Sequence, residues 1–155
     1  MSKTLVVYFS ATGVTKSVAE KISEALDGEL FEIEPVEKYT EKDLDWRDKN
    51  SRSSIEMNDK SSRPKILNKI SNTEEYDTIV LGFPVWWYTA PTIVNTFIEE
   101  NNLSGKKAYV FVTSGSSGVE GSFKDLKNTY KDIDFVSGRR LNGNEKIEEY
   151  IDWIK

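Results

Sequence analysis

Short, almost continuous apolar runs alternate along the chain with longer segments of helical spacing. The runs at 5–9, 78–83 and 108–113 are rich in β-branched and aromatic residues, the pattern of strands covered on both faces in a parallel sheet. The segments 31–34 and 132–135 instead alternate apolar with acidic residues, so each leaves one face in contact with water. We therefore predict three central strands and two edge strands.

Helical spacing separates the strands. In 14–26 the apolar residues share one face, and Gly28 follows as a stop signal. Similar spacing recurs in four later segments: 66–70, 93–98, 123–130 and 147–154. Strand and helix thus alternate five times, which predicts a three-layer, doubly wound α/β fold. A five-stranded parallel sheet in the order 2-1-3-4-5 suits the edge assignment, although that assignment alone allows other orders.

One segment, 36–62, is polar, charged and without sustained periodicity. Long loops in compact domains are usually functional or disordered. Its arginines stand near aspartates and Trp46 offers an apolar anchor, which favours an ordered flap over a linker. The sequence shows no internal repeat, and its 155 residues suit one domain spanning 1–155.

Composition narrows the chemistry. Cysteine and histidine are both absent, which removes thiolate nucleophiles, imidazole bases and the usual zinc and iron–sulfur ligands, so we expect no metal site. A net charge of -5 disfavours nucleic-acid binding and favours basic partners. The apolar run near the N-terminus is too short for a membrane span and lacks a signal-peptide cleavage site, so we expect a cytoplasmic protein that does not enter membranes.

Ligands of doubly wound sheets bind beyond the carboxyl ends of the strands, where the strand order reverses. The turn 10–15 after the first predicted strand offers three hydroxyls and a glycine where a helix exposes its unpaired amides, which predicts an anion site. It lacks the glycine spacing of a dinucleotide site and the lysine of a P-loop, so a terminal phosphate monoester fits better. The alternative is that Thr12 merely caps the helix.

Two further loops follow the third and fourth predicted strands. The loop 84–91 holds three consecutive aromatic residues between two prolines. Adjacent side chains in a loop point in different directions, which favours stacking on a planar ring over a role in the core or in partner binding. The loop 113–118 is rich in glycine and hydroxyl residues and lets the backbone approach a flat ligand, although alone it is a generic flexible loop.

Together the turn Ser10–Thr15, the loop Pro84–Tyr88 and the segment Thr113–Gly115 resemble a flavodoxin, most closely the short-chain group with a Trp-Trp pair. The resemblance implies bound FMN, its phosphate in the first turn and its ring between the other two loops. The residues expected to bind this cofactor are Ser10, Thr12, Gly13, Val14, Thr15, Pro84, Val85, Trp86, Trp87, Tyr88, Thr113, Ser114, Gly115 and Gly118.

Under this resemblance the flavin carries the electrons and no side chain needs to be catalytic. The first expectation is a low-potential electron carrier that serves redox partners with basic docking faces. The alternative is an FMN-dependent NAD(P)H:quinone-type reductase whose substrate pocket the segment 36–62 would shape. A noncatalytic scaffold is a third reading. A receiver domain and a cysteine-dependent phosphatase are excluded, because the residues that they need are missing.

Overall fold

The computed structural model describes residues 3–154, and its centre is a five-stranded parallel sheet in the order β2-β1-β3-β4-β5. The predicted order and both edge strands are confirmed. The strands are β1 (Thr4–Tyr8), β2 (Glu29–Glu32), β3 (Thr78–Pro84), β4 (Lys107–Thr113) and β5 (Asp134–Arg140). All strands run the same way, so all their carboxyl ends meet at one edge of the sheet.

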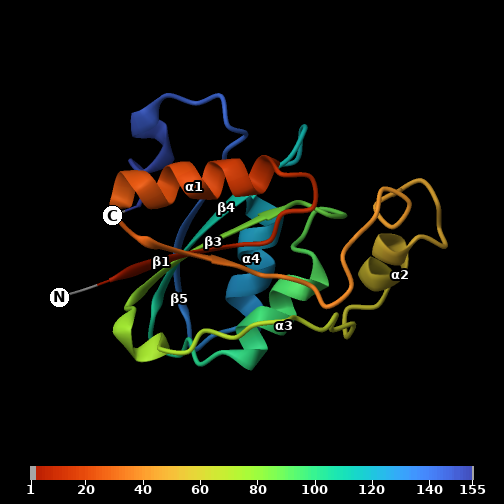
Figure 1. The fold of residues 1–155 in the computed structure, drawn as a ribbon, viewed down its shortest axis with the longest axis horizontal. Helices are drawn as coiled ribbons and strands as arrows, with labels where there is room; N and C mark the ends of the chain where they lie inside the picture. Colours follow the sequence, from red (N-terminus) through yellow and green to blue (C-terminus); the bar gives the residue numbers. More distant parts are fainter. Residues whose placement is uncertain (1–2, 155) are drawn as a thin grey trace.

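Helices cover both faces of this sheet. The helical segments are α1 (Val14–Leu26), α2 (Arg52–Asn58), η1 (Thr73–Glu75), α3 (Thr92–Glu100), α4 (Glu120–Thr129) and η2 (Ile147–Tyr150). Figure 1 shows α1 and the C-terminal segment on one face, with α3 and α4 on the other. The short helix α2 stands apart, beyond the end of the sheet where the strands finish.

Alternate side chains of each central strand enter two separate cores. In β1, Leu5 and Val7 pack with residues of α3 and α4, whereas Val6 and Tyr8 pack with residues of α1. All four are buried. This alternation explains why the central strands are apolar on both faces, and burying each large side chain contributes about 1.5–3 kcal/mol at most.

One glycine in this sheet is required by close packing. At Gly82 of β3, an added Cβ would lie only 1.9 Å from the ring of Phe111, which stands on the neighbouring strand β4. The Phe111 ring is fully buried in the core beneath α1. The bare backbone of Gly82 therefore provides the space that the Phe111 ring occupies.

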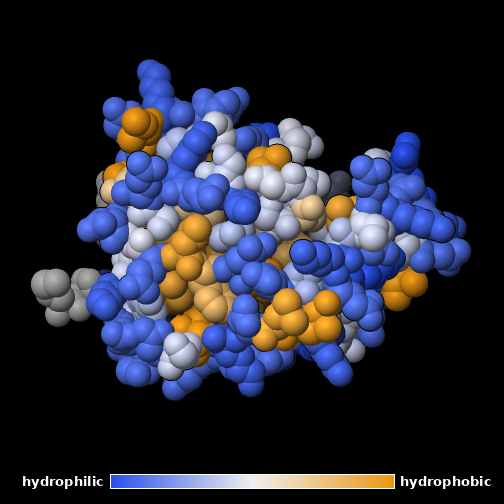
Figure 2. Space-filling model, in the orientation of Figure 1, coloured by the Kyte–Doolittle hydropathy of each residue, from blue (hydrophilic) through white to orange (hydrophobic). Residues whose placement is uncertain are grey.

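The helix predicted at 66–70 is wrong. This segment forms no helix: Ile66 makes an isolated antiparallel bridge to Pro35, in which the Val36 amide donates to the Lys65 carbonyl at 2.9 Å and the Leu67 amide donates to the Glu34 carbonyl at 2.8 Å. Antiparallel pairing beyond the end of β2 therefore overrides the helical spacing. Figure 2 shows apolar side chains gathered below α1, where β2 forms the sheet edge; Leu30 of β2 and Leu67 are among the exposed apolar residues.

The helix predicted at 147–154 is reduced to the single 3₁₀ turn η2. Competing donors explain the early end of this turn. The Trp153 indole donates to the Tyr150 carbonyl at 2.9 Å, and the Ser137 hydroxyl of β5 donates to the Trp153 carbonyl at 3.0 Å. The Tyr150 carbonyl thereby accepts from a side chain, and the Ile154 amide donates to the Ile151 carbonyl at 3.0 Å instead of continuing a helical ladder to Tyr150.

The flap, residues 36–62, contains α2, which Ser51 caps by accepting a hydrogen bond from the Ser54 amide. Trp46, the expected anchor, is 71% exposed, so that expectation is wrong. Tyr39 anchors the flap instead. Its ring packs edge-on against Phe9 and Trp86, at 5.6 and 5.4 Å between ring centroids.

Candidate functional site

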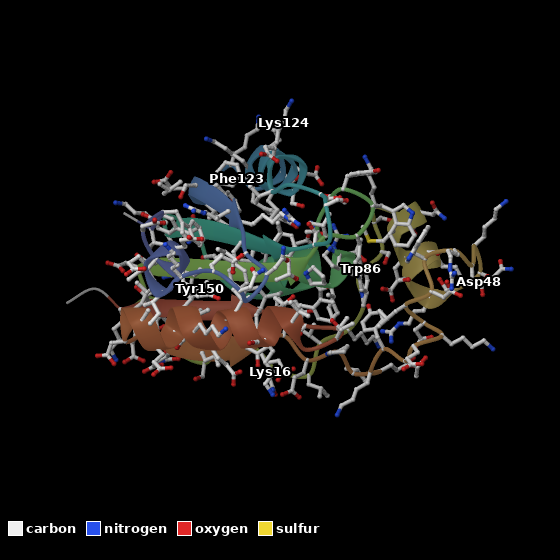
Figure 3. The ribbon with its side chains drawn as sticks, turned by 90° about the horizontal axis from the view of Figure 1, so that it is seen from above. Lys16, Asp48, Trp86, Phe123, Lys124 and Tyr150 are labelled. Carbon is white, nitrogen blue, oxygen red and sulfur yellow. The ribbon has the colours of Figure 1, made fainter. Side chains whose placement is uncertain are left out.

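The three loops predicted from the sequence meet at the carboxyl edge of the sheet. The Thr15 and Thr113 hydroxyls share a 2.7 Å hydrogen bond, which joins the start of α1 to the end of β4. The Trp86 ring packs edge-on against Phe9 at 5.7 Å, which joins the aromatic loop to the end of β1. In Figure 3, Trp86 lies at the end of the sheet that faces α2.

The turn after β1 leaves the start of α1 open. Gly13 is the N-cap and has a φ of 100°, a left-handed conformation that favours glycine. Within residues 3–154 no side chain caps this helix; the Gly13 amide donates to the Ser10 hydroxyl at 3.0 Å. The alternative role of Thr12 as the cap is therefore excluded, and the first amides of the helix are left without a side-chain partner at the cap.

The aromatic loop closes in a tight two-residue turn. Trp86 and Thr89 exchange backbone hydrogen bonds of 3.0 and 3.1 Å, and Trp87 and Tyr88 between them have φ values of 50° and 65°. Two positive φ values define a type I′ turn, which normally uses asparagine and glycine. Large aromatic residues in this conformation store strain, a feature that gathers at functional sites.

The three aromatic side chains of this loop have different surroundings. Trp86 packs against Phe9 and Tyr39, whereas Trp87 is 42% exposed and Tyr88 is 79% exposed. Burial, then the hydrogen bond from Tyr39 to the Glu56 carboxylate, raises the pKa of Tyr39 far above its ordinary range. Trp86 thus rests on a ring that stays neutral, while Trp87 and Tyr88 remain accessible to a ligand.

Arg140 holds the third loop, a role that the sequence analysis did not foresee. Its guanidinium donates to the carbonyls of Ser114 and Gly115 at 3.0 and 2.8 Å. The Ser114 amide donates to Asn142 at 3.0 Å, and the Ser114 hydroxyl donates to the Ser117 carbonyl. Register offers a signal, since Arg140 ends β5 opposite Val112 of β4, one residue before this loop begins.

The aromatic loop, the third loop and the flap line a cavity of about 640 Å³. Its lining residues are Leu44, Trp46, Ser53, Val85, Trp86, Trp87, Tyr88, Ser114, Gly115, Ser116 and Ser117. None of the three flap residues was among the expected cofactor-binding residues, although the reductase alternative expected the segment 36–62 to shape a substrate pocket. Pro84, Thr113 and Gly118 were expected in the site but lie outside this lining, as do all five expected residues of the first turn; Thr113 instead bonds to Thr15.

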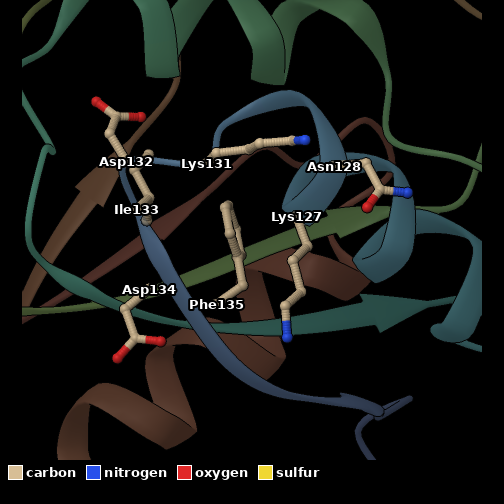
Figure 4. A pocket seen from close by; sticks show the side chains of 7 residues that line it. All are labelled: Lys127, Asn128, Lys131, Asp132, Ile133, Asp134 and Phe135. Atoms are coloured by element: carbon tan, nitrogen blue, oxygen red, sulfur yellow. The ribbon is translucent and has the colours of Figure 1, made fainter.

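Two other hollows differ in chemistry or in place. One of about 270 Å³ includes Ser10 and Ala11 of the first turn, and its charged lining residues are Glu32, Glu34 and Lys38. Another, of about 440 Å³, is formed by 127–135 and is shown in Figure 4. It lies where β5 begins, at the opposite end of the sheet from the three loops.

Residues 3–154 contain neither a metal-binding group of side chains nor a helix that could span a membrane. This part of the chain contains no group of three or more acidic side chains that could hold a metal ion. None of its helices is long and apolar enough to span a membrane.

The chain belongs to the flavodoxin family, because a flavodoxin family model matches residues 3–155. Among solved structures, it is similar to a candidate flavoprotein from Bacteroides eggerthii, with 47% identity, a TM-score of 0.96, and coverage of 99% of this chain and 96% of that one. A flavoprotein from Lactobacillus acidophilus in complex with FMN shares the fold, at 24% identity, a TM-score of 0.76 and full coverage of both chains.

One curated relative carries an enzymatic description. An FMN-dependent NADH:quinone oxidoreductase from Brevibacillus brevis is 25% identical over 141 residues, which cover 80% of this chain. The match spans 66% of that protein, just under two thirds of its length.

Proposed function

We propose that this flavodoxin-family protein binds FMN at the three loops and carries electrons between redox enzymes. The membership of the flavodoxin family, a similar structure in complex with FMN and an FMN-dependent relative support FMN as the cofactor. The uncapped amides at the start of α1, together with the hydroxyls of Ser10 and Thr12, suit a phosphate monoester. Hydrogen bonds to a charged group are worth about 1.5–3 kcal/mol each, so three or four would hold it without a metal.

The cavity that receives the ring supports this fit. Trp87 and Tyr88 offer exposed aromatic faces, while Ser116 and Ser117 offer hydroxyls and the backbone of 115–117 offers amides. Bound FMN supplies the redox chemistry, because its ring accepts and releases electrons. The chain's own residues bind the phosphate, orient the ring and restrict the access of water to it.

One observation carries the role of electron carrier. Among its described lining residues, the cavity has no charged side chain, and hence no carboxylate, lysine or arginine that would activate a substrate. The net charge of the chain is -5, which suits partners with basic docking faces. We therefore expect electron transfer to such a partner to slow as salt concentration rises.

The second candidate function is an NAD(P)H:quinone-type reductase. Leu44 and Trp46 of the flap line the same cavity, which gives it an apolar wall beyond the three loops. The NADH:quinone oxidoreductase relative agrees with this reading.

FMN binding is tested by titrating the cofactor-free protein with FMN and with riboflavin, which lacks the phosphate. Riboflavin should bind at least about 100-fold more weakly, because it forfeits several charged hydrogen bonds. Equal affinity for both would refute the phosphate site. Mixing the FMN-loaded protein with NADPH or NADH in the absence of oxygen separates the two roles: rapid loss of the yellow absorbance supports the reductase, and no change supports the carrier.

A further inference from the structure

The flap contributes to the ring cavity from a part of the chain that supplies no strand. Leu44 is half-buried and Trp46 is 71% exposed, so these two residues form the outer rim of the cavity. Ser53, in the first turn of α2, lines the same cavity and is only 1% exposed. The flap therefore presents both apolar surface and a buried hydroxyl to whatever occupies this space.

The Ser53 hydroxyl lacks a hydrogen-bond partner among the described residues. The neighbouring Ser51 and Ser54 hydroxyls, by contrast, bond to each other at 2.9 Å. A buried hydroxyl left unpaired costs about 1–3 kcal/mol. A ligand with an oxygen or nitrogen at its edge would recover that cost, and the absence of charge in the described lining favours an uncharged ligand.

The flap is held in place before any ligand arrives. Arg52 of α2 pairs with Glu56 at 2.9 Å, donates to the Glu37 carbonyl at 2.7 Å and lies over the Tyr39 ring at 3.8 Å. Because Tyr39 also packs against Trp86, the flap and the aromatic loop form one connected unit. A wall that is already ordered loses little conformational entropy when a ligand binds, so the ligand binds more tightly than it would to a mobile loop.

We propose that Ser53, Leu44 and Trp46 form a recognition wall for a flat, uncharged ring with a carbonyl or ring nitrogen at its edge. Ser53 donates a hydrogen bond to that edge, while Leu44 and Trp46 cover the ring. This inference rests on the proposed function, because such a ring belongs either to FMN itself or to a quinone-class acceptor that lies against it.

The test uses Ser53→Ala and Trp46→Ala, with Ile55→Ala as the matched control. Ile55 lies on the same helix, is 58% exposed and does not line the cavity. FMN affinity is measured by titration, and affinity for menadione, a quinone probe, by quenching of intrinsic fluorescence in both the cofactor-free and the FMN-loaded protein. The thermal stability of each cofactor-free variant is measured in parallel.

We expect Ser53→Ala to weaken one of the two ligands by about tenfold, the equivalent of one hydrogen bond. Weaker FMN binding assigns the wall to the cofactor, and weaker menadione binding with unchanged FMN affinity assigns it to the acceptor. Cofactor-free Ser53→Ala should be no less stable than the wild type, because the hydroxyl it loses is unpaired. A merely structural role would instead lower that stability.

Two outcomes would overturn the wall: unchanged affinity for both ligands in Ser53→Ala and Trp46→Ala, or equal losses in Ile55→Ala. A wild-type protein that binds no FMN would refute the proposed function alone. The wall is then decided by whether cofactor-free Ser53→Ala binds menadione more weakly than the wild type does.

Discussion

The Thr15 and Thr113 hydroxyls lie 2.7 Å apart and are buried, although 98 residues separate them in the chain. Their hydrogen bond links the helix that begins at the proposed phosphate site to the strand that leads into the third loop. The distance between the first turn and the third loop is therefore fixed before a ligand binds to both of them.

Substitutions of this threonine pair by valine should be non-additive. Thr113→Val should lower the free energy of unfolding by about 1–3 kcal/mol, because it leaves the Thr15 hydroxyl buried without a partner. The double variant Thr15→Val with Thr113→Val should lose less than the sum of the two single changes, since both hydroxyls are gone. Urea denaturation of the four cofactor-free proteins checks this, and strictly additive losses would show that the two hydroxyls do not interact.

Tyr88→Gly should raise the stability of the cofactor-free protein and lower its affinity for FMN. Tyr88 has a φ of 65°, and glycine accepts this conformation without strain. Relief of this strain should outweigh the extra entropy that glycine gives to the unfolded chain. The free energy of unfolding of the cofactor-free protein should therefore rise by about 0.5–1 kcal/mol. FMN affinity should fall, because an aromatic stacking face is lost. Thermal melts and FMN titration measure the two effects; a variant that loses stability while keeping FMN affinity would contradict both expectations.

Gly82→Ala should destabilise the sheet, because its Cβ would lie 1.9 Å from the Phe111 ring. Overpacking of this kind costs about 1–3 kcal/mol. Adding Phe111→Leu provides space, so the double variant should lose less than the two single losses combined. Chemical denaturation tests this coupling. Gly115→Ala is the control, since no atom lies within 4 Å of the added Cβ.

The pair of Arg63 and Glu99 should make stability depend on acid pH. Hydrogen bonds from Arg63, then from the Tyr130 hydroxyl, hold the pKa of Glu99 below its ordinary value of 4.5. Because this pKa is lowered in the folded state, the stabilising contribution of ionised Glu99 is present above pH 4.5. It is lost as the pH falls through the pKa of Glu99 in the folded protein. Because the Glu99 side chain is 42% exposed, solvent screening limits the contribution to less than about 1 kcal/mol.

Glu99→Gln should therefore be less stable than the wild type near neutral pH, and the two should converge in acid. Glu100→Gln is the matched control, because the contact of Glu100 with Lys69 is long, at 3.9 Å, and exposed. Urea unfolding across a pH series measures the difference. A gap between wild type and Glu99→Gln that persists undiminished in acid would exclude the ion pair as its source.

The sequence by itself determined which strands are central and which lie at the edges, although it left more than one strand order open. Continuous apolar runs identified β1, β3 and β4 as central, because a strand that is buried on both faces is apolar at every position. Alternation of apolar and acidic residues identified β2 and β5 as edges, because a strand that is buried on one face is apolar only at every second position. It also indicated which loops gather at the carboxyl edge, since parallel strands bring their ends together.

Tertiary structure decided what lies around those loops. Helical spacing at 66–70 gave way to an isolated bridge with Pro35, beyond the end of β2, because backbone hydrogen bonds between distant segments outweigh a weak local preference. Trp46 faces outward while Tyr39 packs against Trp86, and Ser53 reaches the ring cavity without a bonding partner among the described residues. Contacts between segments far apart in the chain have no period, so only the folded chain could show which residues of the flap line the cavity.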